Sequence, residues 1–190
     1  MEDSIPMGES KEKRLNRFQN GSPIEIIETL LNSINNYFNN ELRVTFSNPT
    51  RTQPALMILG VHSVALTISY GLFNKQREAG YRMYLEHFVD GDTPDTKFST
   101  IAAEIHEWRN VIAHRWLNVA GHDIGYDLNM LEGWKKEGNS LLINPKIYLD
   151  HFLSAFENGG RIYRYEQILT TDQMLEDAKQ RLISKYLDEA

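Results

Sequence analysis

The chain has 190 residues, of which 41% are hydrophobic and 24% charged, with a formal net charge of -6 and a pI of about 5.5. This composition is ordinary for a soluble globular protein and lacks the overall basic charge typical of proteins that bind duplex nucleic acid. The absence of cysteine excludes disulfides, thiolate metal sites and cysteine nucleophiles. Because the polar N-terminus has no apolar stretch like that of a signal peptide, we expect a cytoplasmic protein.

The first 20 residues are polar and charged, and we expect them to form a flexible tail before a single helical domain over 21–190. Ser22-Pro23 predicts a helix start, with Ser22 as the N-cap and Pro23 in the first helical position. Apolar residues at helical spacing extend this helix to Asn39-Asn40. A connection over 41–51 is expected to follow.

A long apolar helix is predicted from about Thr52 to Asn74. Residues 55–73 contain no Asp, Glu, Lys or Arg and approach the length of a membrane span. The segment also holds several polar and small residues, and the centre of a helical bundle requires a helix that is apolar all round. We therefore favour a buried helix over a membrane span, with His62 as a core histidine whose polar atoms are satisfied.

The remaining elements are predicted mainly from turn and capping residues. We expect a short helix over Ala79–Val89, a loop over 90–95 and a helix over Thr96–Leu117. Segments 126–132 and 141–143 flank a turn-like stretch and predict a small β-hairpin. Two further helices should begin at Asn144-Pro145, ending near Phe156, and at Thr171-Asp172. The expected fold class is all-α: a helical bundle with a β-hairpin insertion near 126–143.

The helix over 96–117 carries the residues most suited to chemistry. At about 100° per residue, its two faces separate cleanly. The apolar face contains Phe98, Ile101, Ile105, Trp108, Ile112 and Trp116. The polar face contains His106, Glu107, Arg109, Asn110 and His114, next to the small residues Ala102, Ala103 and Ala113. A solvated polar face or an oligomer interface would show the same pattern.

Arg109 and His114 are the candidate catalytic residues, together with Asn110. Arginine is always charged and presents a planar fork of donors that suits phosphate, and histidine can exchange a proton near neutral pH. Cleavage of a phosphodiester without a metal needs both functions. Asn110 is four residues from His114 and can contact it, while His106 and Glu107 are supporting candidates.

The segment Arg109-Asn110-Val111-Ile112-Ala113-His114 resembles the R-N-x3-H signature of the HEPN superfamily (higher eukaryotes and prokaryotes nucleotide-binding). The similarity covers about residues 24–117. It implies an all-α domain that often dimerises, so that two motif copies face each other across a cleft. Many members are metal-independent endoribonucleases of toxin–antitoxin, antiviral or RNA-processing systems. Others bind nucleotides or proteins without cutting, and this is the alternative function.

Cleavage of this kind would proceed by attack of the ribose 2′-OH on the adjacent phosphorus, giving 2′,3′-cyclic phosphate ends. His114 would act as general acid or base and Arg109 would bind the phosphate. We expect single-stranded RNA as substrate, a homodimer, an antitoxin or other protein partner as a possibility, and no membrane. One toxin branch carries a tyrosine, modified by its antitoxin, where this chain has Trp116, so that mode of neutralisation is not expected.

No cofactor or metal is expected. His106, His114 and His122 are spaced eight residues apart, which is too far for a shared metal on one helix. A second candidate surface lies near the C-terminus. There, Arg161 and Arg164 alternate with tyrosines, which suits either a basic–aromatic patch for single-stranded nucleic acid or, as we favour, a half-buried connector.

Overall fold

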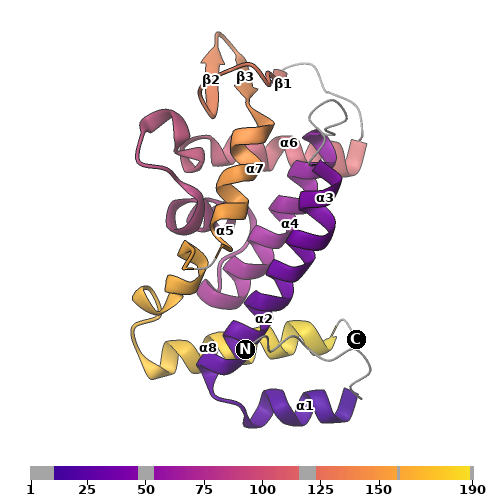
Figure 1. Cartoon of the computed structure of the whole chain (residues 1–190), viewed down its shortest axis with the longest axis vertical. Helices are drawn as coiled ribbons and strands as arrows, with labels where there is room; N and C mark the ends of the chain where they lie inside the picture. Colours follow the sequence, from indigo (N-terminus) through magenta and orange to yellow (C-terminus); the bar gives the residue numbers. More distant parts are fainter. Residues whose placement is uncertain (1–10, 47–53, 116–122, 158, 189–190) are drawn as a thin grey trace.

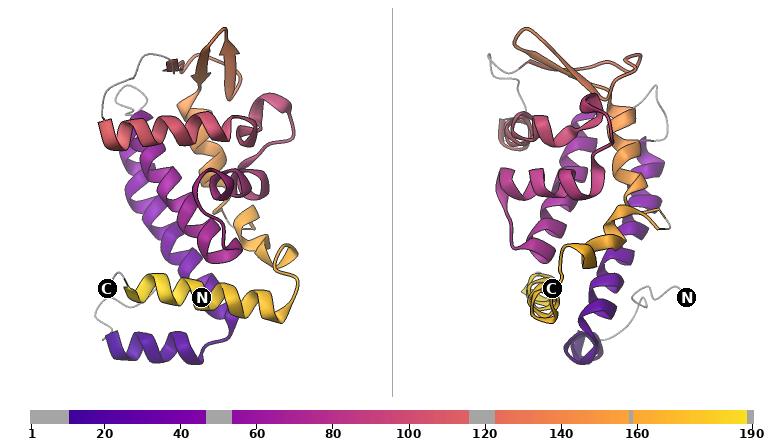
Figure 2. Two further views of the ribbon diagram at one scale, coloured as in Figure 1. Left: turned by 180° about the vertical axis from the view of Figure 1, so that it is seen from behind. Right: turned by 90° about the vertical axis from the view of Figure 1, so that its left-hand side faces the viewer.

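The computed structural model describes residues 11–46, 54–115, 123–157 and 159–188, and these are mostly helical with one small sheet at one end (Figure 1). The mainly helical class is as predicted. Helices α2, α4 and α7 run along the length of the molecule, and α1 and α8 cross its other end, far from the sheet (Figures 1 and 2).

Helix α1 (Lys11–Asn20) occupies half of the predicted tail. The tail prediction is wrong for 11–20, and residues 1–10 lie outside the described part. Phe18 is 0% exposed, and the Lys179 ammonium of α8 donates hydrogen bonds to the carbonyl oxygens of Gln19 (3.3 Å) and Gly21 (2.8 Å). These bonds satisfy carbonyl groups at the end of α1 that have no partner within the helix. The contact comes from a helix 160 residues away, so local composition did not show it.

Helix α2 (Pro23–Tyr37) begins as predicted, because the Ser22 hydroxyl accepts a hydrogen bond from the backbone N–H of Glu25 at 3.3 Å. It does not end at Asn39-Asn40. A π-helical turn η1 (Phe38–Leu42) and helix α3 (Arg43–Phe46) continue it, so the predicted connection is wrong for 41–46. Burial of Phe38 against Phe156, with ring centroids 4.8 Å apart, outweighs the poor helix propensity of the two asparagines.

Helix α4 (Pro54–Phe73) confirms the predicted central helix. It packs against α5, α6, α7 and α8. Among the described helices it alone has the length and hydropathy of a membrane span, over Ala55–Phe73, and half of that stretch is buried inside the protein. Such burial agrees with its interpretation as the centre of a helical bundle.

Helix α5 (Arg77–Tyr84) and the π-helical turn η2 (Leu85–Val89) confirm the next predicted helix. Two short 3-10 turns, η3 (Pro94–Thr96) and η4 (Phe98–Ile101), precede helix α6 (Ala102–Arg115). The α-helix therefore starts later than the predicted Thr96. The Asp90 carboxylate accepts hydrogen bonds from the backbone N–H (3.1 Å) and the hydroxyl of Ser99, which holds this turn in place.

The predicted hairpin is a three-stranded sheet of β1 (Asp123–Tyr126), β2 (Trp134–Glu137) and β3 (Ser140–Ile143), in the order β1-β3-β2. The hairpin itself joins the antiparallel β2 and β3 through a turn at Gly138, which has a φ of +60°. Its first strand is therefore β2 and not 126–132. Strand β1 pairs with β3 in parallel, a long-range pairing that strand patterns along the chain do not reveal.

Helix α7 (Pro145–Ser154) and helix α8 (Asp172–Asp188) start where they were predicted. The buried Asn144 side chain caps α7 by accepting hydrogen bonds from the backbone N–H groups of Lys146 (3.0 Å) and Ile147 (3.3 Å), and donates one to the carbonyl of Met130 (2.7 Å). It thereby joins the sheet region to the helix. A 3-10 segment η5 (Arg161–Gln167) connects α7 to α8.

The core next to α6 is aromatic. The buried rings of Phe98, Tyr148 and Phe152 are in contact, and the Tyr81 and Tyr148 hydroxyls are hydrogen-bonded to each other. The predicted apolar face of α6 is confirmed where its side chains are described. The buried members are Ile105 and Trp108 on α6 together with Phe98 and Ile101 of the preceding turn η4, whereas the Ile112 side chain and Trp116 lie outside the described residues. This packing fixes which face of α6 remains polar.

Candidate functional site

The structure describes the side chains of four of the five predicted site residues on the polar face of α6. Arg109, Asn110 and His106 are partly buried, and Glu107 is exposed. The backbone of His114 belongs to the last turn of α6, but its side chain lies outside the described part of the chain. The described contacts therefore do not include any between the His114 imidazole and Arg109.

Arg109 and Asn110 are joined directly. The Nη1 of Arg109 donates a hydrogen bond to Oδ1 of Asn110 at 2.9 Å. The Nε of Arg109 is buried and has no hydrogen-bond partner, and no carboxylate forms an ion pair with this guanidinium within the described residues. A buried donor left without a partner is costly, but because Nε is buried, an anion arriving from solvent would contact this guanidinium through its Nη atoms. The arginine is thus held in place by Asn110, while its charge has no carboxylate partner among the described residues.

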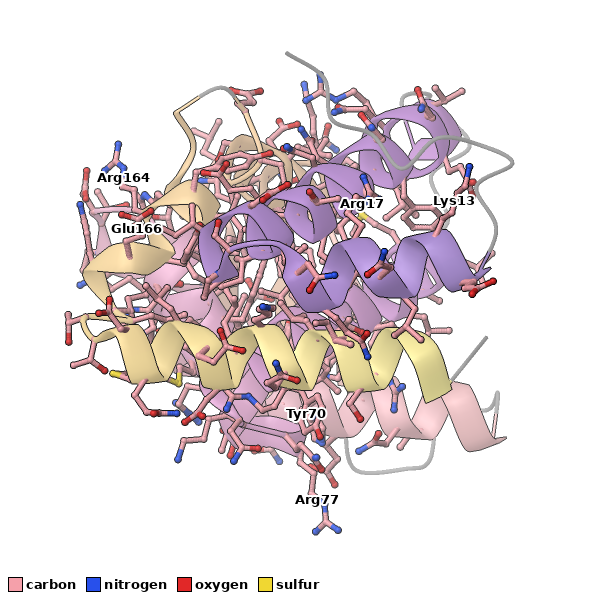
Figure 3. The ribbon with its side chains drawn as sticks, turned by 90° about the horizontal axis from the view of Figure 1, so that it is seen from below. Lys13, Arg17, Tyr70, Arg77, Arg164 and Glu166 are labelled. Atoms are coloured by element: carbon pink, nitrogen blue, oxygen red, sulfur yellow. The ribbon has the colours of Figure 1, made fainter. Side chains whose placement is uncertain are left out.

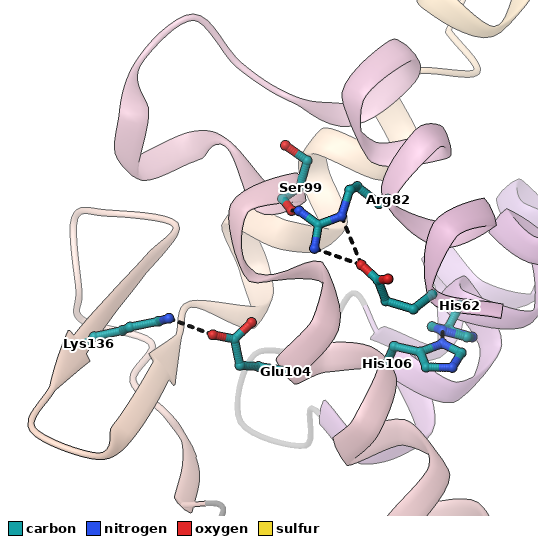
Figure 4. Close-up of polar contacts among 7 residues, drawn as sticks. His62, Arg82, Ser99, Glu104, His106 and Lys136 are labelled. Carbon is teal, nitrogen blue, oxygen red and sulfur yellow. Dashed lines mark hydrogen bonds and ion pairs between the residues drawn. The ribbon is translucent and has the colours of Figure 1, made fainter.

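A pair of histidines lies beside this arginine. Nε2 of His62, on α4, and Nδ1 of His106, on α6, are 2.9 Å apart, which is hydrogen-bond distance (Figure 4). His62 is 0% exposed, and its ring lies against that of Tyr81 with centroids 4.3 Å apart. The expectation of a buried histidine is confirmed, but only Nε2 is satisfied, because Nδ1 has no partner among the described residues. The pairing joins residues 44 apart and has no local signal in the sequence.

Burial and the Arg109 charge keep both imidazoles neutral at pH 7. The pKa of His62 is lowered to about 3, chiefly by burial and next by interaction with His106 and Arg109. The pKa of His106 is also lowered, chiefly by burial and next by Arg109, while Glu78 acts in the opposite direction. Arg109 is therefore the one fixed cation of this cluster.

The hydrogen bond between the two rings also determines where their protons lie. A proton on Nδ1 of His62 would be a buried N–H without a partner, a rare and costly arrangement. We therefore assign the proton to Nε2 of His62, which donates to Nδ1 of His106. His106 then carries its own proton on Nε2 and acts there as a neutral hydrogen-bond donor.

Polar contacts hold the start of α6 and the turn η4 before it against neighbouring elements (Figure 4). Arg82 of α5 pairs with Glu78 (2.7 Å) and donates to the carbonyl of Ser99 at 2.9 Å. Lys136 of β2 pairs with Glu104 of α6, and this contact lowers the pKa of the Glu104 carboxyl. Trp108 packs edge-on against Tyr126 of β1, with centroids 5.5 Å apart. The sheet therefore supports the helix that carries the site.

A metal site is not found within the described residues, where no three His, Asp or Glu side chains come together. The predicted spacing of His106, His114 and His122 is not tested, since the His114 side chain and His122 lie outside those residues.

The site thus combines a partly free guanidinium, an amide that positions it and a neutral histidine pair. Such a set offers a positive charge and neutral hydrogen-bond donors, which suit a phosphate. No family model, no curated protein and no solved structure matches the chain.

Proposed function

We propose that this protein is a metal-independent endoribonuclease of the HEPN type, acting in the cytoplasm on single-stranded RNA. One observation supports the proposal most strongly. Arg109 is positioned by Asn110 on the polar face of α6 and has no carboxylate partner among the described residues. It also precedes His114 by five residues on the same helix. A phosphodiester would supply the anionic partner that Arg109 lacks among the described residues.

In the proposed reaction, RNA supplies its own nucleophile. His114 accepts the proton of the ribose 2′-OH, whose oxygen attacks the adjacent phosphorus. The bond from phosphorus to the 5′-oxygen breaks, and that oxygen receives a proton. The products are a 2′,3′-cyclic phosphate and a 5′-hydroxyl. General acid–base catalysis of this kind contributes about 10²- to 10⁴-fold to the rate.

Arg109 offsets the negative charge that grows on the phosphate oxygens in the transition state. Asn110 holds the guanidinium by accepting its hydrogen bond. His106, neutral and with a proton on Nε2, supplies a further donor beside Arg109 without adding charge that would repel it. Glu107 is exposed on the same helix, and orientation of an imidazole is the role proposed for it.

A homodimer would place two copies of the motif face to face. One His114 could then accept the proton from the 2′-OH while the other donates to the leaving oxygen. With this arrangement, a chain that carries one such histidine supplies both a general base and a general acid to the dimer. A toxin–antitoxin or defence role, with a protein partner that restrains the activity, belongs to the same proposal.

The proposed cleavage requires the ribose 2′-OH as nucleophile, and removal of this group tests the proposal. After the main cleavage site in an RNA has been mapped, a single 2′-deoxy nucleotide placed 5′ to that bond should abolish cleavage there, because the nucleophile is gone. The same substitution one nucleotide further 3′ should leave cleavage unchanged and is the matched control. Gel analysis and mass spectrometry of the ends check both. Cleavage of the 2′-deoxy linkage, or products with 3′-hydroxyl ends, would contradict the proposed chemistry.

A further inference from the structure

A polar groove lies between η2 and η5, and it is formed by residues that the proposed reaction does not use. Its volume is about 270 Å³, and it is lined by His87, Phe88, Arg161, Arg164, Gln167 and Ile168. Figure 1 shows η5 between α7 and α8, on the other side of the molecule from the C-terminal end of α6. The groove is therefore separate from the end of α6 that carries the motif.

The 3-10 geometry of η5 explains how its polar residues come together. A 3-10 helix has three residues per turn, so side chains three apart lie above one another. In η5, Arg161, Arg164 and Gln167 follow this spacing, and all three line the groove although the helix is interrupted at Arg164. Arg164 has φ and ψ of -95° and 18°, where two helical turns meet, and its side chain points away from the ribbon (Figure 3). Two guanidinium groups and an amide are thus presented on the same side.

Neither guanidinium of the groove is neutralised by a carboxylate within the described residues. Arg161 donates a hydrogen bond through Nη1 to the backbone carbonyl of Asp90, which fixes its position and leaves its charge. The Asp90 carboxylate is engaged by the backbone and hydroxyl of Ser99. Two positive charges are therefore concentrated in one groove of a protein whose net charge is -6.

The tyrosines of this segment do not add a stacking surface. The Tyr163 hydroxyl donates a hydrogen bond to Oδ1 of Asn32 at 2.8 Å, and Tyr165 is buried. The basic–aromatic patch considered from the sequence is therefore wrong, because both tyrosines are used for packing. Phe88, Ile168 and the His87 ring supply the remaining walls of the groove. This lining favours recognition of a charged group over the stacking of successive bases.

We propose that the groove between η2 and η5 binds a terminal phosphate, meaning a phosphate monoester. Two guanidinium groups match the double negative charge of a monoester better than the single charge of a phosphodiester, and arginine suits the geometry of phosphate oxygens. The volume is slightly below the usual range for pockets that bind drug-sized ligands, which suits a phosphate with a small group attached. The monoester can belong to a free nucleotide or to the end of a strand. This inference does not depend on cleavage at Arg109.

Binding measured by calorimetry and by NMR titration tests the proposal with three probes: inorganic phosphate, 5′-AMP, and a short oligodeoxynucleotide with or without a 5′-phosphate. The oligodeoxynucleotide lacks the 2′-OH needed for cleavage, so the result is independent of the nuclease proposal. Saturable binding of at least one monoester is expected. Arg164→Gln should weaken it about tenfold or more, because a charged hydrogen-bond donor is lost. Arg164 is exposed, so this variant should fold normally.

Arg77→Gln is the matched control, since it removes the same charge from an exposed arginine of α5 that does not line the groove. It should bind like the wild type. Binding of 5′-AMP alone identifies a free nucleotide as the source, and a requirement for the strand's 5′-phosphate identifies a strand end. The proposal is overturned if no monoester binds saturably, if Arg164→Gln binds as tightly as the wild type, or if the oligonucleotide is the one probe that binds and does so equally with and without its 5′-phosphate.

Discussion

Replacing Arg109 by alanine is expected to lower the rate of RNA cleavage by about 10²- to 10³-fold, the effect typical of losing one preorganised donor to a developing oxyanion. The substitution removes the fixed cation from the polar face of α6 and frees the Asn110 amide that holds it. It should not weaken folding strongly, because the buried Nε of Arg109 has no partner to lose. Single-turnover cleavage of a labelled RNA, with thermal unfolding measured in parallel, provides the two readouts.

Two further variants show whether the loss is specific to Arg109. Arg77→Ala removes an exposed arginine of α5 and should cleave at the wild-type rate. Arg109→Lys keeps the positive charge but not the planar fork, so it should recover only part of the rate. Wild-type cleavage by a folded Arg109→Ala variant would remove this residue from the proposed mechanism.

The free energy of unfolding is expected to fall as the pH drops from about 6.5 toward 3, and His62 should be a main cause. In the folded protein the pKa of His62 is about 3, whereas an unfolded histidine titrates near 6.5. Between these values the unfolded chain binds a proton that the folded chain does not, so stability present above pH 6.5 is lost as the pH falls. The slope for one such group is about 1.4 kcal/mol per pH unit. The lowered pKa of His106 acts in the same direction.

His62→Gln isolates this contribution, because glutamine cannot be protonated and still carries a side-chain N–H for Nδ1 of His106. Urea unfolding at pH 7 and pH 4.5 should show a smaller loss of stability for His62→Gln than for the wild type, with a difference of about 2 to 3 kcal/mol. Carboxyl groups with lowered pKa values, such as Glu104, affect both proteins and cancel in the comparison. An equal loss in the two proteins would show that His62 is not held neutral by the fold.

Elements with local signals were predictable from the sequence. The caps Ser22 and Asn144 mark the starts of α2 and α7 correctly, and the uncharged run over 55–73 identifies α4. The errors have a common cause in distant contacts. Phe18 and Phe38 are buried by other elements, so helix replaces the expected tail and connection. The parallel pairing of β1 with β3 is likewise a long-range contact that periodicity does not encode.

The candidate site shows the same division. Arg109 and Asn110 are neighbours on one helix, so their joint position on its polar face followed from helical periodicity. The His62–His106 hydrogen bond did not, because it joins α4 to α6 across 44 residues, and His62 looked like an ordinary residue of an apolar helix. A buried histidine in an uncharged run was the only available signal. It becomes informative once the facing helix is known to carry His106 and Arg109.

The most direct test of the central claim is cleavage of a mixed single-stranded RNA pool in excess EDTA by the wild type and by His114→Ala, with analysis of the ends. The account predicts that the wild type alone cleaves, leaving 2′,3′-cyclic phosphates. Equal cleavage by His114→Ala, or activity that EDTA abolishes, would contradict a metal-independent ribonuclease whose chemistry lies at His114. Absence of cleavage by either protein, when both are folded and dimeric, would contradict it as well and favour a module that binds a nucleotide or a protein partner.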